Sequence, residues 1–144
     1  MPHSLSLTRE LFVPRELIFQ AWTEPTHLSA WYSPQATMRR EIASDFRLDG
    51  EYLFAWTGEE GVRYVQRGVF RAIDPPGGFR CSLCFAGGFP DHYRTELAVT
   101  LEEEDGSSRI LIRQEGFPSE AEKDAQGRLW TKLLDQLEAY FSVI

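Results

Sequence analysis

Cysteine is scarce in this 144-residue chain, and the two that it has, Cys81 and Cys84, cannot build a disulfide framework. The amino-terminal residues 1–7 lack a basic stretch followed by an apolar core, so no export signal is expected. No apolar run reaches the roughly 18 residues that a membrane-spanning helix requires. We therefore expect a reduced, cytoplasmic protein that does not insert into membranes.

The chain also has fewer basic than acidic residues. The chain has 15 Lys and Arg against 22 Asp and Glu, a net charge of −7, and its basic residues form no run. Binding to phosphate backbones depends on clustered Lys and Arg, so no nucleic acid partner is expected. The length is typical of one domain, and hydrophobic residues make up 42% of the chain. Residues 1–144 are therefore predicted to form a single domain.

Several common signatures of catalysis and nucleotide binding are missing. The chain contains no G-x-S-x-G, no phosphate-binding Gly-Lys-Ser/Thr loop and no G-x-G-x-x-G. His3, His27 and His92 do not have metal-ligand spacing. Cys81 and Cys84 lie within a strand pattern, where residues three apart point to opposite faces, so one thiol is predicted to be buried and one to lie on the outer face. No catalytic residue, metal or cofactor is expected.

Turn signals divide the middle of the chain, among them Asp49-Gly50, residues 74–78, Gly87-Gly88 and Asp105-Gly106, which follows an acidic run. Between them, apolar and polar residues alternate, which predicts an antiparallel sheet with one covered face. The residues assigned to the covered face are Tyr52, Phe54, Trp56, Tyr64, Gln66, Gly68, Phe70, Ala72, Phe79, Cys81, Leu83, Phe85, Tyr93, Thr95, Leu97, Val99 and Leu101. Val65, Val69 and Ile73 are assigned to the outer face with three arginines. A first strand places Leu5, Leu7, Leu11 and Val13 on one face, with Arg9 as the exception.

Two regions change to helical periodicity. Pro14 and Pro25 are each predicted to begin a short helix, the second carrying Leu28 and Trp31. Ser119 and Glu122 fit a capping box that begins a long helix running to the end of the chain. Its apolar stripe consists of Trp130, Leu134, Leu137, Phe141 and Ile144.

The resulting order is strand, two short helices, several strands and one long helix, an α+β arrangement. A twisted sheet curls around such a helix, and we expect an unfilled apolar hollow between the two. A solid aromatic core is the alternative interpretation of the same residues. Polar residues on the covered face favour a pocket, because buried hydroxyls and amides need partners. The predicted ligand-binding residues are Phe54, Trp56, Tyr64, Gln66, Phe85, Tyr93, Trp130 and Leu134, of which Tyr64, Gln66 and Tyr93 would orient the ligand and the others enclose it.

Five segments carry a family resemblance, of which residues 12–17 resemble the family's entry to its first helix. Residues 22–31, WTEPTHLSAW, resemble the A-W-T-x-P-x-x-L-x-x-W signature of the activator of heat shock protein 90 ATPase homologue (AHSA-type) family, in the START-like superfamily. Residues 49–54 resemble its G-G-x-Y-x-F strand, with Glu51 in place of the second Gly, and residues 68–76 resemble its G-x-Y/F-x-E-I-x-P-P hairpin. Residues 130–141 resemble its last helix. The resemblance implies a helix-grip (START-like, Bet v-like) fold, in which a curved antiparallel sheet wraps round a long C-terminal helix, and a hydrophobic cavity.

Three functions follow as hypotheses. The first is binding of a small, mostly hydrophobic ligand between the sheet and the C-terminal helix. The second is a cyclase-, aromatase- or hydrolase-like enzyme on an apolar substrate, in which His92, Tyr93 and Arg94 beside the cavity mouth supply a base, a hydroxyl and a cation. The third is a chaperone-linked interaction module, which predicts a contiguous exposed apolar patch. Either a monomer or a homodimer is compatible with the sequence.

Overall fold

The computed structural model describes residues 3–35, 37–89 and 92–142. Its elements follow the predicted order of one strand, two short helices, six strands and one long helix. They are β1 (His3–Leu11), α1 (Arg15–Thr23), α2 (Pro25–Trp31), β2 (Arg39–Ser44), β3 (Glu51–Thr57), β4 (Arg63–Asp74), β5 (Gly78–Gly87), β6 (Arg94–Glu104), β7 (Ser107–Phe117) and α3 (Glu120–Ser142). The predicted α+β helix-grip fold is confirmed.

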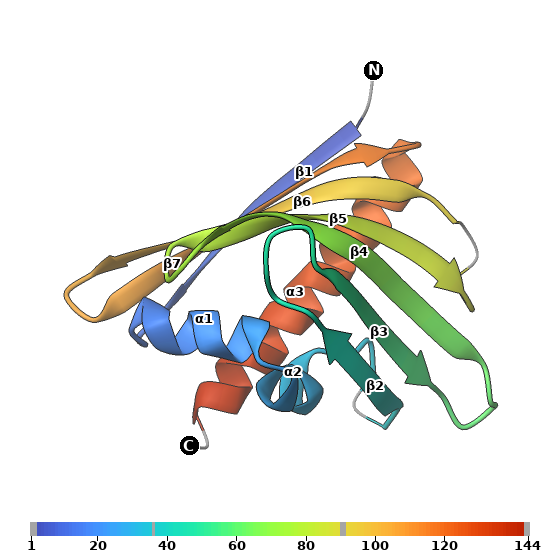
Figure 1. The fold of residues 1–144 in the computed structure, drawn as a ribbon, viewed down its shortest axis with the longest axis horizontal. Coiled ribbons are helices and arrows are strands. Elements are labelled where there is room, and N and C mark those ends of the chain that lie inside the picture. Colours follow the sequence, from blue (N-terminus) through green and yellow to red (C-terminus); the bar gives the residue numbers. More distant parts are fainter. Residues whose placement is uncertain (1–2, 36, 90–91, 143–144) are drawn as a thin grey trace.

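The seven strands form one antiparallel sheet in the order β1-β7-β6-β5-β4-β3-β2. The strands β2 to β7 are neighbours in the sheet in the order of the chain. β1 pairs with β7 and forms the edge opposite β2. Figure 1 shows the sheet curving over all three helices, which lie on its concave side, with α3 running beneath the strands. No helix in the described part of the chain is both long enough and apolar enough to cross a membrane.

Alternation along the strands places most of the predicted residues on the covered face. Tyr52, Phe54 and Trp56 of β3 are buried, as are Cys81, Leu83 and Phe85 of β5. The exception is the end of β4, where the register shifts between Phe70 and Ala72. Ile73 then pairs with Phe79 and packs against the core, although the alternation predicted it on the outer face. A β-bulge inserts one residue and reverses the side on which the following side chains lie.

Arg9, the exception in the first strand, joins the sheet to the last helix. It lies on the inward side of β1, where its guanidinium contacts Asp135 of α3 at 2.9 Å and Glu138 at 3.1 Å. Pairs of this kind near the surface contribute about 0–1 kcal/mol each, so their main effect is to orient α3 along β1.

The long helix begins as the capping pattern predicts. The Ser119 hydroxyl donates to the Glu122 carboxylate, and the Ser119 carbonyl accepts the amide of Lys123 at 3.2 Å. The predicted stripe is buried at Trp130, Leu134 and Leu137. Phe141 is only partly buried, and Ile144 lies outside the described residues.

Candidate ligand pocket

Side chains from α1 and α2 fill the space between the centre of the sheet and α3. Trp22 lies 5.1 Å from Trp31 and 6.0 Å from Trp130, measured between ring centroids. Tyr32, directly after α2, stacks on Trp56 at 5.9 Å and meets Trp130 edge-on at 6.2 Å. The end of α2 is tied to α3 because the Gln136 amide donates to the Trp31 carbonyl at 2.7 Å. The hollow expected at this point is therefore occupied by the chain itself.

The polar groups in this packed centre have partners. Tyr32 donates to the side-chain carbonyl of Gln66 at 3.1 Å, and the Trp56 indole donates to the Tyr32 carbonyl at 2.9 Å. Beside Gln66 and Phe54 there is a cavity of about 20 Å³. One water molecule needs about 10–15 Å³ by this measure, so the cavity has room for a water molecule but not for an organic ligand.

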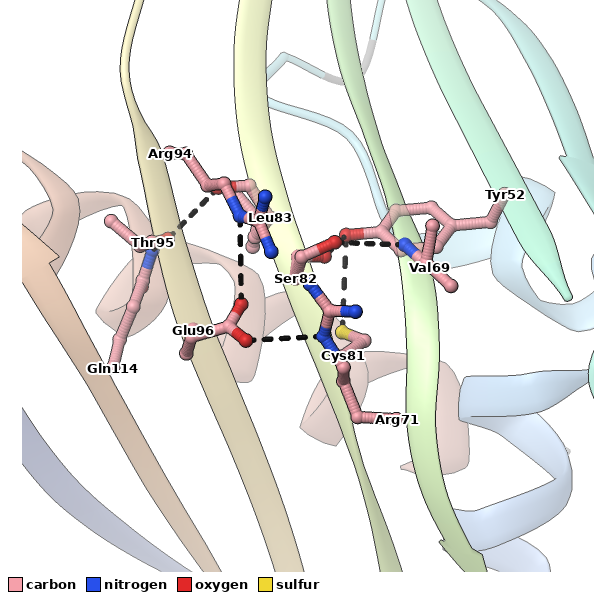
Figure 2. A network of polar contacts seen from close by, with 10 residues as sticks. All are labelled: Tyr52, Val69, Arg71, Cys81, Ser82, Leu83, Arg94, Thr95, Glu96 and Gln114. Carbon is pink, nitrogen blue, oxygen red and sulfur yellow. Dashed lines mark hydrogen bonds and ion pairs between the residues drawn. The ribbon is translucent and has the colours of Figure 1, made fainter. Parts of the chain in front are cut away.

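A second buried polar chain connects α3 to the sheet. The Trp130 indole donates to Gln114 at 2.7 Å, the Gln114 amide donates to the Thr95 hydroxyl at 2.8 Å, and Thr95 donates to the Leu83 carbonyl at 3.0 Å. Figure 2 shows the sheet end of this chain, from Gln114 through Thr95 to Leu83. These side chains are hydrogen-bonded to one another and to the Leu83 carbonyl inside the fold, which makes this network structural rather than ligand-directed.

An apolar pocket of about 170 Å³ opens nearer the beginning of α3. One wall comes from Phe85 of β5 together with Phe89 and Tyr93, and the other from the first half of α3. The described residues that line it are Phe85, Phe89, Tyr93, Glu122, Ala125, Gln126 and Leu129. An apolar cavity of about 150 Å³ binds benzene, so this pocket is large enough for one aromatic ring.

The aromatic wall is held by ring contacts among its own members. Phe85 lies 4.8 Å from Phe89 and 5.4 Å from Tyr93, and both contacts are edge-to-face. Tyr64 contacts Phe89 edge-to-face, with the two ring centroids 5.3 Å apart. Such pairs contribute about 0.5–1.5 kcal/mol each beyond their burial, so the wall is largely preformed.

The structure divides the eight predicted ligand-binding residues into four groups. Phe85 and Tyr93 line the apolar pocket, and Tyr64 contacts its wall. Phe54 and Gln66 line only the small internal cavity. Trp56, Trp130 and Leu134 are no more than 1% exposed and line neither space. These last three residues belong to the packed core.

Five residues of the pocket were not predicted. Glu122, Ala125, Gln126 and Leu129 come from the first turns of α3, and Phe89 comes from the loop after Gly87-Gly88. Gln126 precedes Trp130 by four residues, so extending the buried stripe one turn toward the beginning of the helix would have found it. Phe89 follows no period, and no signal in the sequence marks it.

The other motifs of the sequence lie in a strand, a hairpin and a loop. Cys81 is buried and Cys84 is partly exposed on the opposite face of β5. The acidic run ends in the β6–β7 hairpin, where Asp105 and Gly106 have positive φ angles of 54° and 80°. His92 is exposed, and its ring nitrogen lies 3.3 Å from the Gly87 carbonyl. Within residues 3–35, 37–89 and 92–142, no three His, Cys, Asp or Glu residues gather as metal ligands.

The buried thiol predicts a loss of stability at alkaline pH. Burial raises the pKa of Cys81 to about 12, from an ordinary value of 9.0. Because the folded-state pKa is the higher one, stability is intact below pH 9 and declines as the pH rises toward 12. By pH 10.5 this thiol should cost on the order of 2 kcal/mol. Burial raises the pKa of Tyr52 as well, so above pH 10 its ionisation adds a further loss of stability to that from Cys81.

Urea unfolding at pH 8 and pH 10.5 measures this loss. In Cys81→Ala the difference between the two pH values should shrink by about 2 kcal/mol. In the control Cys84→Ala it should shrink less, because Cys84 is only partly buried. An equal pH dependence in Cys81→Ala and the parent protein would contradict the account.

Comparison with known proteins gives a family match and a fold match. The sequence model described as "Activator of Hsp90 ATPase homolog 1-like protein" matches residues 13–142. No curated protein matches the sequence. A solved structure from Chromobacterium violaceum is 24% identical, with a TM-score of 0.82 and coverage of 96% of both chains. A putative uncharacterized protein from Rhizobium leguminosarum is 18% identical, with a TM-score of 0.87 and coverage of 100% of this chain and 97% of that one. At these identities the two structures show the fold alone.

Proposed function

This chain belongs to the family of activator of Hsp90 ATPase homolog 1-like proteins, and we propose that it binds a small, mostly apolar molecule between Phe85, Tyr93 and the first half of α3. The observation that carries this proposal is the 170 Å³ pocket with its aromatic wall. Concave apolar sites with a few polar groups are the usual form of small-molecule sites.

The size of the pocket restricts the ligand. A volume of 170 Å³ holds one ring with a short substituent, so we expect single-ring compounds rather than long-chain lipids or sterols. A ligand of about eight heavy atoms that gains about 0.5–0.85 kcal/mol per heavy atom binds with a dissociation constant on the order of 1 mM to 10 μM. The proposed function is therefore capture of a small compound, and we expect it to be fast and reversible.

The other two hypotheses have less support. An enzyme using His92 would need that ring to face the substrate, whereas His92 is exposed and is not among the residues that line the apolar pocket. Among the described residues, the large apolar side chains that are exposed come from four separate segments, as Phe12, Leu17, Leu48 and Val62. Single exposed apolar residues are normal on a protein surface and do not by themselves mark a partner site.

Filling the pocket with a side chain tests the proposal. Single-ring compounds are screened by ligand-observed NMR, and the best binder is titrated into the parent protein. In Ala125→Phe the new ring should occupy the pocket and weaken binding at least about tenfold, because the ligand and the Phe ring cannot occupy the same space. Ala139→Phe, at an exposed alanine on the same helix that does not line the pocket, should bind like the parent.

The two variants carry the same change in helix propensity, so any difference between them comes from the pocket. Equal binding by Ala125→Phe and Ala139→Phe would place the ligand elsewhere. Failure of every single-ring compound to bind the parent protein would contradict the proposal directly.

A further inference from the structure

The side chain of Gln126 brings an amide to the wall of the apolar pocket. The residue is 5% exposed and lines the apolar pocket. No hydrogen bond joins its side chain to a residue in the described part of the chain, and no fully buried polar side-chain atom there lacks a partner, so the Gln126 amide faces the open pocket. Other buried amides of the fold are paired, as Gln114 is with Thr95 and Trp130. An amide that faces an open pocket is hydrated, and a ligand can replace that water with its own hydrogen-bonding group.

The charged side chain among the described residues that line the pocket is acidic. Glu122 lines the pocket, and none of the described lining residues is a Lys, Arg or His. The Ser119 hydroxyl donates to the Glu122 carboxylate and fixes its position at the start of α3. The nearest lysine in sequence, Lys123, pairs with Glu120 at 3.0 Å. A ligand carboxylate would therefore lose water, meet a like charge and find no cation among the described lining residues.

We propose that this pocket selects single-ring aromatic compounds that are neutral or cationic and carry one hydrogen-bonding substituent, which pairs with the Gln126 amide. Phe85, Phe89 and Tyr93 contact the ring. Glu122 discriminates against carboxylates and favours amines. This selectivity rests on the proposed ligand-binding function and adds the chemical class of the ligand to it.

Four compounds that differ only in their substituent test the selectivity. Toluene, benzyl alcohol, benzylamine and benzoate are titrated at pH 7 by NMR. Benzyl alcohol and benzylamine should bind about fivefold to tenfold more tightly than toluene, the effect of one hydrogen bond in a buried site. Benzoate should bind at least about tenfold more weakly than benzyl alcohol.

Two variants assign these differences to residues. In Gln126→Leu, which keeps the size of the side chain and removes an unpaired amide, the advantage of benzyl alcohol over toluene should disappear while toluene still binds. In Glu122→Gln the penalty on benzoate should fall. Thermal unfolding of both variants verifies that they remain folded.

The outcomes separate this inference from the function on which it rests. Equal affinity for toluene and benzyl alcohol in the parent protein would overturn the role of Gln126 and leave ligand binding intact. Benzoate as the tightest ligand would overturn the role of Glu122. Binding of none of the four compounds would overturn both the selectivity and the proposed function.

Discussion

Trp130→Ala is expected to lower the free energy of unfolding by about 3–5 kcal/mol, the usual cost of deleting a buried aromatic side chain. The Trp130 ring is 0% exposed and contacts Trp22 and Tyr32, which fill the centre of the fold. Its indole is also the donor to Gln114 at 2.7 Å. The variant therefore leaves both a cavity and a buried acceptor without its donor. Urea unfolding followed by far-UV circular dichroism measures the loss.

Two milder variants separate packing from hydrogen bonding. Trp130→Phe keeps most of the ring and removes the donor. Trp22→Phe makes the same change at a buried indole that forms no hydrogen bond within the described residues. We expect Trp130→Phe to lose about 1–3 kcal/mol more than Trp22→Phe, since an orphaned buried acceptor carries that cost. Equal losses would show that the Trp130–Gln114 bond adds nothing, and a loss under about 1 kcal/mol in Trp130→Ala would contradict the packed centre.

Gly68→Ala is expected to destabilise the sheet by about 3 kcal/mol or more. A Cβ atom at Gly68 would lie 1.9 Å from the Ser82 carbonyl oxygen and 2.8 Å from the Tyr52 ring. Tyr52 pairs opposite Gly68 and donates to that same carbonyl at 2.7 Å, while the Ser82 hydroxyl accepts the Val69 amide (Figure 2). Because the clash is with backbone, β4 and β5 would have to separate to relieve it.

The same substitution at Gly127 should have the opposite sign. Gly127 lies inside α3, and a Cβ there would meet only a Leu5 methyl at 3.5 Å, an ordinary contact. Removing a helix glycine without a clash gains about 1 kcal/mol. Urea unfolding of the two variants gives the comparison. A loss below about 1 kcal/mol for Gly68→Ala would mean that the sheet opens easily at this point.

Local patterns predicted the fold well because its elements are marked by short-range chemistry. Ser119 and Glu122 mark the start of α3, Pro14 and Pro25 mark the short helices, and alternation marks the covered face of the sheet. The bulge after Phe70 was not predictable, because it depends on how β4 and β5 pair rather than on either strand alone. Ile73 was assigned to the wrong face for this reason.

The pocket was harder to predict than the fold. Trp22 and Trp31 lie in the core, but nothing in the sequence shows that Tyr32 joins them and fills the central space. Whether helices leave a hollow depends on the path of the loops between them. Phe85 and Tyr93 were predicted because they follow the alternation of their strands, whereas Phe89 lies in a loop with no period.

The position of a bound ring is the most direct test of the account. Methyl resonances of the parent protein are followed by NMR as benzyl alcohol is added. We expect shifts for Ala125 and Leu129, which line the pocket, and none for Leu97 and Leu134, which lie at the centre of the sheet and of α3. Shifts confined to Leu97 and Leu134 would place the ligand in the packed centre and contradict the account.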